Sequence, residues 1–80
     1  MRDYDALCNY LSQRKGQRIE MSFSEIEEII GDKLPKSAYE YQAWWSNSTL
    51  RHTHSRAWLN AGFKTVDVNS NISKRIVVFE

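Results

Sequence analysis

Residues 21–31, MSFSEIEEIIG, carry the strongest folding signal in the chain. Ser22 and Glu25 form an S-x-x-E capping box, in which the hydroxyl accepts a hydrogen bond from a first-turn N–H and the carboxylate reaches back to the cap. Gly31 is a typical helix stop. Between these signals the apolar side chains recur at the spacing of one helix face: Phe23, Ile26, Ile29 and Ile30. We therefore predict a helix that buries this face and leaves its carboxylates in solvent.

Downstream of Pro35, a second S-x-x-E pair formed by Ser37 and Glu40 predicts another helix. Trp44 lies about 100° around this helix from Trp45, which is expected to face the core, so we predict that the Trp44 indole is partly exposed. The expected core face consists of Ala38, Tyr41 and Trp45. The expected outer face consists of Tyr39, Gln42 and Ser46.

A polar link over residues 47–53 leads to a short helix over residues 55–61, which Gly62 ends. The helices on either side of the link also fit one bent helical unit. The expected buried side chains of the short helix are Ala57, Trp58 and Ala61.

The two ends of the chain complete the predicted fold. Residues 65–68 and 75–79 alternate β-branched side chains, and residues 69–71 between them tolerate a hairpin turn. Residues 18–21 alternate polar and apolar side chains and predict a short edge strand. Residues 3–13 predict an amphipathic helix capped by Asp3, with an apolar face made of Tyr4, Leu7, Cys8 and Leu11.

The order of these elements is that of a winged-helix domain: helix, short strand, two or three helices and a C-terminal hairpin. The predicted fold is therefore α+β and winged-helix-like, with three to four short helices, in a single domain over residues 1–80. A fold alone does not fix a function.

The composition favours a cytoplasmic protein without membrane contact. The single cysteine, Cys8, excludes an internal disulfide, whereas small secreted domains usually carry several. No stretch approaches the roughly 20 apolar residues of a membrane helix, and the N-terminus lacks the apolar core of a signal peptide.

Catalysis has little support in the sequence. Neighbouring carboxylates such as Glu27 and Glu28 point about 100° apart on a helix, so they do not share one proton-transfer site. Cys8 lies on the apolar face of the first helix, where a thiol serves as a small core group. The H-x-H pair formed by His52 and His54 lacks the further ligands of a zinc site. We expect no enzymatic activity, no metal and no cofactor.

Positive charge is concentrated in the middle of the chain, although the net charge is only +1. Residues 1–32 carry seven carboxylates and four basic side chains, whereas residues 33–66 carry five basic side chains and one carboxylate. Residues 44–56 add hydroxyls and an amide, the groups that contact phosphates and base edges.

This distribution predicts a duplex-DNA-binding surface within residues 36–64. The candidate contact residues are Lys36, Asn47, Arg51, His52, His54, Ser55, Arg56 and Lys64. The predicted hairpin turn at residues 69–71 is a further candidate for DNA contact, as the wing of a winged-helix domain. The same segment also fits a polar loop without a ligand.

Four blocks occur in a characteristic order: F-x-E-I-E from Phe23, L-P-x-S-A from Leu34, W-W-x-N from Trp44 and A-W-x-x-A-G from Ala57. Over about residues 20–80 they resemble a widespread bacterial and phage domain of unknown function. The resemblance implies a domain that occurs as a small stand-alone protein or beside restriction-type regions. This association favours nucleic acid as the binding partner. The resemblance also implies that Asn47 is the amide of the third block. From its residue type, this amide fits either a cap on backbone carbonyls or a group that reads a base edge.

A protein-interaction module is the alternative function, for example a phage-encoded inhibitor of a host defence enzyme. Such a module uses a hydrophobic hot spot, for which Trp44 and Tyr39 are the candidates. An exposed apolar patch favours this alternative, and contiguous cations on one face favour DNA.

Overall fold

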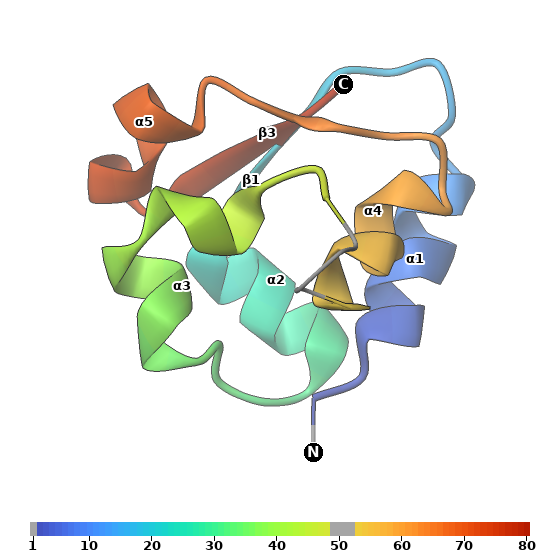
Figure 1. Cartoon of the computed structure of the whole chain (residues 1–80). Coiled ribbons are helices and arrows are strands. Elements are labelled where there is room, and N and C mark those ends of the chain that lie inside the picture. The colour runs from blue at the N-terminus through green and yellow to red at the C-terminus, as the bar shows by residue number, and fades with distance from the viewer. Residues whose placement is uncertain (1, 49–52) are drawn as a thin grey trace.

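The described residues form short helices around a three-stranded antiparallel sheet (Figure 1). The computed structural model describes residues 2–48 and 53–80. The N-terminal half contains α1 (Tyr4–Ser12), β1 (Ile19–Ser22), α2 (Phe23–Ile30), α3 (Lys36–Glu40) and the 3-10 helix η1 (Gln42–Trp45). The C-terminal half contains η2 (Thr53–Ser55), α4 (Arg56–Leu59), β2 (Thr65–Val66), α5 (Val68–Asn71), η3 (Ile72–Lys74) and β3 (Ile76–Phe79). The predicted α+β class is confirmed.

The first two helices begin where their capping residues predict. Ser22 and Glu25 form the capping box: the serine hydroxyl accepts from the glutamate amide at 3.1 Å, and Glu25 Oε1 accepts from the serine amide at 3.0 Å. The Asp3 carboxylate accepts from the Ala6 amide at 3.2 Å and caps α1. Gly31 ends α2 in the left-handed conformation, with φ at 76°. None of the described helices is long and apolar enough to cross a membrane.

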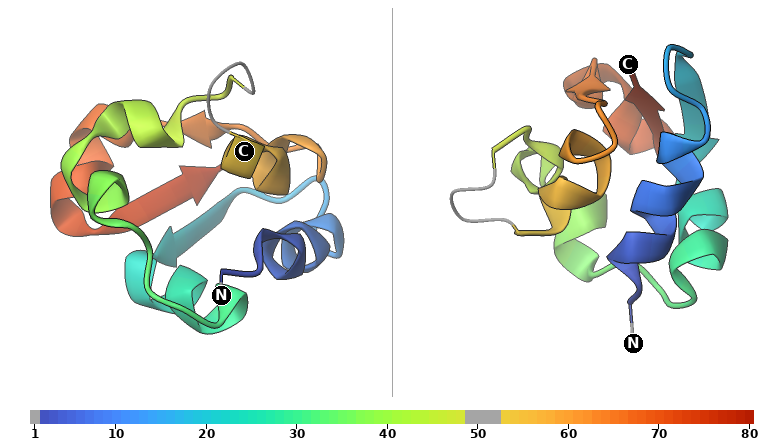
Figure 2. Two further views of the ribbon diagram at one scale, coloured as in Figure 1. Left: turned by 60° about the horizontal axis from the view of Figure 1, so that its bottom comes forward. Right: turned by 90° about the vertical axis from the view of Figure 1, so that its right-hand side faces the viewer.

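β3 is the central strand of the sheet, in the order β1-β3-β2. Both of its neighbours are antiparallel to it, and Phe79 lies opposite Ile19 on one side and opposite Thr65 on the other. β1 is therefore an edge strand, as predicted. The helices α1, α2 and α4 lie on one side of this sheet (Figures 1 and 2).

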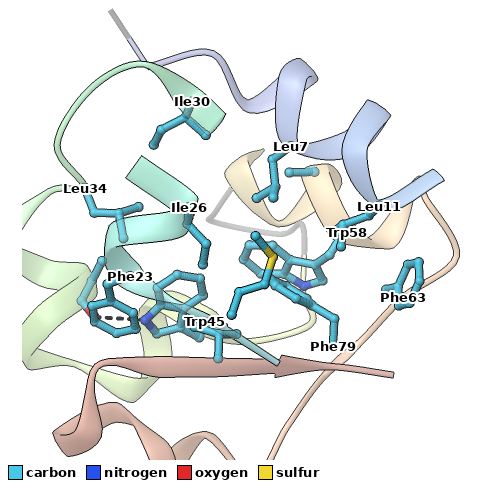
Figure 3. Close-up of a cluster of buried hydrophobic side chains, with 14 of the residues drawn as sticks. Leu7, Leu11, Phe23, Ile26, Ile30, Leu34, Trp45, Trp58, Phe63 and Phe79 are labelled. Atoms are coloured by element: carbon cyan, nitrogen blue, oxygen red, sulfur yellow. Dashed lines mark hydrogen bonds between the residues drawn. The ribbon is translucent and has the colours of Figure 1, made fainter. Parts of the chain in front are cut away.

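The core between the sheet and these helices is built mainly from aromatic rings (Figure 3). Phe23 of α2 stacks on Trp45 with ring centroids 5.2 Å apart. Trp45 in turn stacks on Trp58 of α4 at 5.7 Å. Trp58 then contacts Phe79 of β3 at 5.8 Å. This row of buried rings connects α2, η1, α4 and the sheet, and it supplies much of the apolar area that so short a chain buries.

The third helix is shorter than the sequence predicts. α3 ends at Glu40, because Tyr41 adopts an extended backbone with φ at −121° and ψ at 119°. The predicted capping box of Ser37 and Glu40 is wrong: Pro35 is the capping residue, and Ser37 already lies within the helix without a side-chain cap bond. Proline fixes φ near its helical value, so it starts the helix before the serine.

The extended backbone at Tyr41 also changes which side chains face the core. Tyr41, predicted to face inward, is 60% exposed. Tyr39, predicted to face outward, packs edge-on against Phe23 at 4.9 Å. Trp44, predicted to be partly exposed, is buried. Helical spacing does not continue across a residue that is not helical, which explains the wrong predictions for Tyr41 and Trp44. Tyr39 lies within α3, and its ring faces Phe23 of α2.

The helix predicted over residues 55–61 occurs as η2 followed by α4. Its predicted buried side chains are confirmed, and these are Ala57, Trp58 and Ala61. η1 and η2 are separate elements rather than one bent unit, because the backbone is extended at Ser46.

β2 and β3 pair as predicted, but no tight turn joins them. Instead the connection consists of α5 and η3, so residues 69–71 are not a hairpin turn. The carbonyl of Asp67 accepts from the amides of Ser70 and Asn71 at 3.1 Å each and starts the helical turn. Val68 and Ile72 then pack against the core from this connection, which a two-residue turn does not allow.

Candidate nucleic-acid interface

Asn47 is hydrogen-bonded within the fold. Its Oδ1 accepts from Trp58 Nε1 at 3.1 Å and from the amide and hydroxyl of Thr65 at 2.9 and 3.1 Å. Its Nδ2 donates to the Thr65 carbonyl at 3.0 Å. The amide therefore joins the chain after η1 to α4 and to β2. It does not cap a helix. Its oxygen is engaged by three donors, whereas one of the two N–H groups of Nδ2 forms no hydrogen bond within the described residues, and the residue is exposed.

Ser55 and His54 also have structural partners. Ser55 is fully buried, and its hydroxyl donates to the Ser48 carbonyl at 2.8 Å. The imidazole of His54 stacks on the indole of Trp44 at 3.8 Å, with the rings 9° from parallel. Its Nε2 lies 2.6 Å from the Trp44 carbonyl oxygen. These contacts give both side chains a role in holding η2 against η1.

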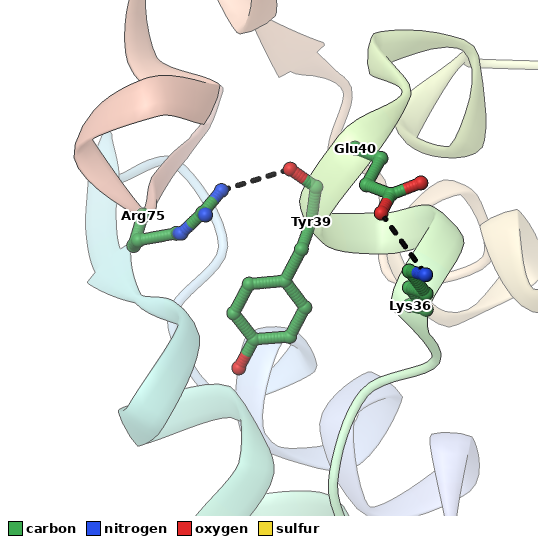
Figure 4. Close-up of polar contacts among 4 residues, drawn as sticks. All are labelled: Lys36, Tyr39, Glu40 and Arg75. Carbon is green, nitrogen blue, oxygen red and sulfur yellow. Dashed lines mark hydrogen bonds and ion pairs between the residues drawn. The ribbon is translucent and has the colours of Figure 1, made fainter.

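Lys36 lies apart from the other candidates. It is exposed on α3, and its Nζ is 3.6 Å from Glu40 Oε1, one helical turn along (Figure 4). α3 and α4 lie on opposite sides of the molecule (Figures 1 and 2). The structure therefore does not bring Lys36 into one continuous ridge with Arg56.

Arg56 and Lys64 are the two described candidates whose charges are exposed and unpaired. Arg56 is the first residue of α4, and Lys64 lies between α4 and β2. Within residues 2–48 and 53–80, neither side chain forms an ion pair. Asn60, one helical turn after Arg56, is a further exposed polar residue of this surface that the sequence analysis did not name. Its spacing of four residues from Arg56 is the sequence signal that places the two side chains side by side. The remaining candidates, Arg51 and His52, lie outside the described residues.

Glu27 is not the solvated carboxylate that the sequence predicts. It accepts from the Tyr39 hydroxyl at 2.5 Å and from the Leu34 amide at 2.9 Å. Burial by itself raises the pKa of Glu27, but these two bonds and the nearby charge of Lys33 hold the pKa below its ordinary value. The same bond to Glu27 raises the pKa of Tyr39. Both groups thus tie α2 to α3, and a structural role accounts for their shifted pKa values.

No metal site is formed by the described residues. Among them, no three histidine, cysteine, aspartate or glutamate side chains are close enough to hold an ion. Cys8 Sγ lies 4.0 Å from Ser12 Oγ, at the distance of a weak hydrogen bond.

The fold and the surface together describe a small α+β domain with exposed cations around α4. A family model described as "Domain of unknown function (DUF7662)" matches residues 4–79, so the chain belongs to this family. The predicted resemblance to a domain of unknown function is confirmed at this level. No curated protein and no solved structure matches the chain significantly.

Replacing Asn47 with Ala should lower the free energy of unfolding by about 2–3 kcal/mol, because Trp58 and Thr65 lose their shared acceptor. Asn47→Asp keeps the acceptor oxygen and loses the N–H donor, so it should lower the free energy of unfolding by less than Asn47→Ala does. Urea denaturation measures both, with the exposed Asn69→Ala as control. Equal stability of Asn47→Ala and the control contradicts the structural role.

Replacing Tyr39 with Phe should raise the pKa of Glu27 and destabilise the fold by about 1 kcal/mol at pH 7. A carboxylate whose pKa is depressed in the folded chain stabilises it above the unfolded pKa, near 4.5, and this stabilisation is lost as the pH falls through the folded pKa. The difference from wild type should therefore shrink at pH 3.

Urea denaturation at both pH values measures this difference, and NMR titration measures the pKa. Tyr41→Phe, which removes an exposed hydroxyl, is the matched control. A difference between Tyr39→Phe and wild type that does not depend on pH contradicts the assignment.

Proposed function

We propose that this chain is a non-catalytic, winged-helix-type domain that binds duplex DNA through the exposed cations around α4. The observation that carries the proposal is the pair of exposed charges, Arg56 and Lys64, which form no ion pair with another described residue and lie at the start of α4 and just beyond its end. Cations that lack carboxylate partners are available to phosphates, and phosphate contacts dominate DNA affinity.

The arrangement of the elements supports a winged-helix domain. A helix, an edge strand and further helices precede two paired strands, and the last strand lies between the other two. In helix-turn-helix proteins one helix presents its N-terminal residues to the major groove. In this proposal α4, which directly precedes β2 and begins with Arg56, is that helix. The connection through α5 and η3, with exposed Asn69 and Lys74, takes the place of the wing.

The proposed surface consists of Arg56 and Lys64, together with Arg51 and His52 from the sequence prediction. Asn47, His54 and Ser55 support it from within by orienting α4 and η2. Lys36 is left out, because Glu40 neutralises it on the other side of the molecule. With three cations at phosphates, the slope of log K against log[salt] should be about −3.

One observation favours the alternative, a protein-interaction module such as a phage-encoded inhibitor of a host defence enzyme. Tyr41 is 60% exposed and is the large hydrophobic side chain that stands out on the surface of the described residues. It is flanked by exposed Gln42 and Ala43. This surface replaces the predicted hot spot of Trp44 and Tyr39, whose rings pack against the core.

The double replacement Arg56→Ala and Lys64→Ala should weaken duplex binding at low salt and flatten the salt slope by about 2, because each phosphate contact contributes about 0.9. Fluorescence anisotropy of a labelled duplex measures both quantities. The charge-matched control replaces Lys33 and Lys36 with Ala, which should leave most of the affinity.

If the two double variants weaken duplex binding equally, the attraction depends on the overall charge of the chain and not on the surface around α4. This result contradicts the proposed binding surface. Loss of duplex binding in Tyr41→Ala, with none in the α4 double, contradicts the α4 surface and assigns the DNA contact to the face around Tyr41. Absence of duplex binding by the wild-type chain at low salt favours the alternative.

A further inference from the structure

A hollow of about 440 Å³ lies between α1 and α4, beside the proposed DNA surface. Small-ligand pockets typically measure about 300–1,000 Å³, so the hollow is large enough for a ligand. Its lining includes Tyr4, Asp5 and Cys8 from α1, His54 from η2, Arg56 from the start of α4 and Asn60 just after its end.

One wall of the hollow is aromatic and held in place by packing. The half-buried ring of Tyr4 lies 6.0 Å from the imidazole of His54 and 6.3 Å from the indole of Trp44. His54 and Trp44 are themselves stacked at 3.8 Å. A fixed aromatic wall binds flat heteroaromatic rings by stacking, and every nucleobase has such a face.

The rest of the lining is polar and carries both signs of charge. Arg56 supplies a guanidinium, which binds phosphate oxygens in a bidentate manner. Asp5 supplies oxygens that only accept hydrogen bonds, and Asn60 supplies a donor and an acceptor. A simple anion does not suit this lining, because the Asp5 carboxylate repels it.

We propose that this hollow binds one nucleotide, with its base against Tyr4, its phosphate at Arg56 and its base edge at Asp5 and Asn60. The choice of ligand rests on the proposed function, since Arg56 belongs to both surfaces. The nucleotide is either free or an unpaired unit of a DNA strand, and both present the same base and phosphate.

The carboxylate of Asp5 also sets a preference among bases. Adenine, cytosine and guanine carry an exocyclic amino group that donates to a carboxylate, whereas the one donor on the base edge of thymine, N3–H, lies between two carbonyl oxygens that repel a carboxylate. The hollow should therefore favour the three amino-bearing nucleotides over thymidylate.

Ligand-observed NMR with the full chain tests this preference, using the four deoxynucleoside monophosphates and inorganic phosphate as probes. We expect the amino-bearing nucleotides to bind at least about tenfold more tightly than thymidylate, the lower end of the effect of one hydrogen bond to a charged group. Inorganic phosphate should bind more weakly than any of them. Asp5→Asn should abolish the preference, and Glu20→Gln, the same change on exposed β1, should retain it.

Nucleotides that bind no better than inorganic phosphate overturn the inference, and so does equal binding of all four bases by the wild-type chain. A preference that survives in Asp5→Asn overturns the position of the base edge.

A second arm uses a duplex with one unpaired adenosine and the fully paired duplex. Tighter binding of the first, lost in Asp5→Asn, assigns the site to a nucleotide within DNA, and equal binding with intact mononucleotide binding assigns it to a free nucleotide. Nucleotide binding without any duplex binding overturns only the proposed function. Duplex binding without nucleotide binding overturns only this inference.

Discussion

The side-chain amide of Asn47 is the constraint on which the rest of the structure depends. Its four hydrogen bonds go to Trp58 of α4 and to the backbone and hydroxyl of Thr65 in β2. Because β2 pairs with the central strand, this side chain fixes α4 relative to the sheet. The orientation of the exposed side of α4, and with it the proposed DNA surface, follows from these four part-buried bonds.

The sequence predicts the elements that are controlled by local chemistry. The capping box at Ser22 and the helix stop at Gly31 are interactions between near neighbours, and the β-branched alternation predicts β2 and β3 as strands. Prediction from the sequence fails where the backbone conformation of a single residue changes the direction of the chain. Tyr41 is extended between two helical segments, and Asp67 adopts a positive φ of 54° before α5. Neither residue type announces these conformations, because packing of later residues against the core selects them.

The candidate site is less predictable than the fold. A residue type shows that a side chain is polar, but not where its hydrogen bonds go. Asn47, His54 and Ser55 are predicted as DNA contacts from their polarity, yet their bonds hold η1, η2, α4 and β2 together. Arg56 and Lys64 behave differently, since a long charged side chain without a nearby carboxylate remains in solvent. Charge therefore predicts exposure for Arg56 and Lys64, and their contact with DNA stays a prediction.

The central claim is that DNA contacts the face around α4. Amide chemical-shift mapping of the ¹⁵N-labelled chain with a short duplex at low salt tests it most directly. If DNA binds this face, the largest shift changes occur in α4 and at Lys64, with little change in α3. Largest changes around Tyr41 and η1, or no changes at saturating duplex, contradict it.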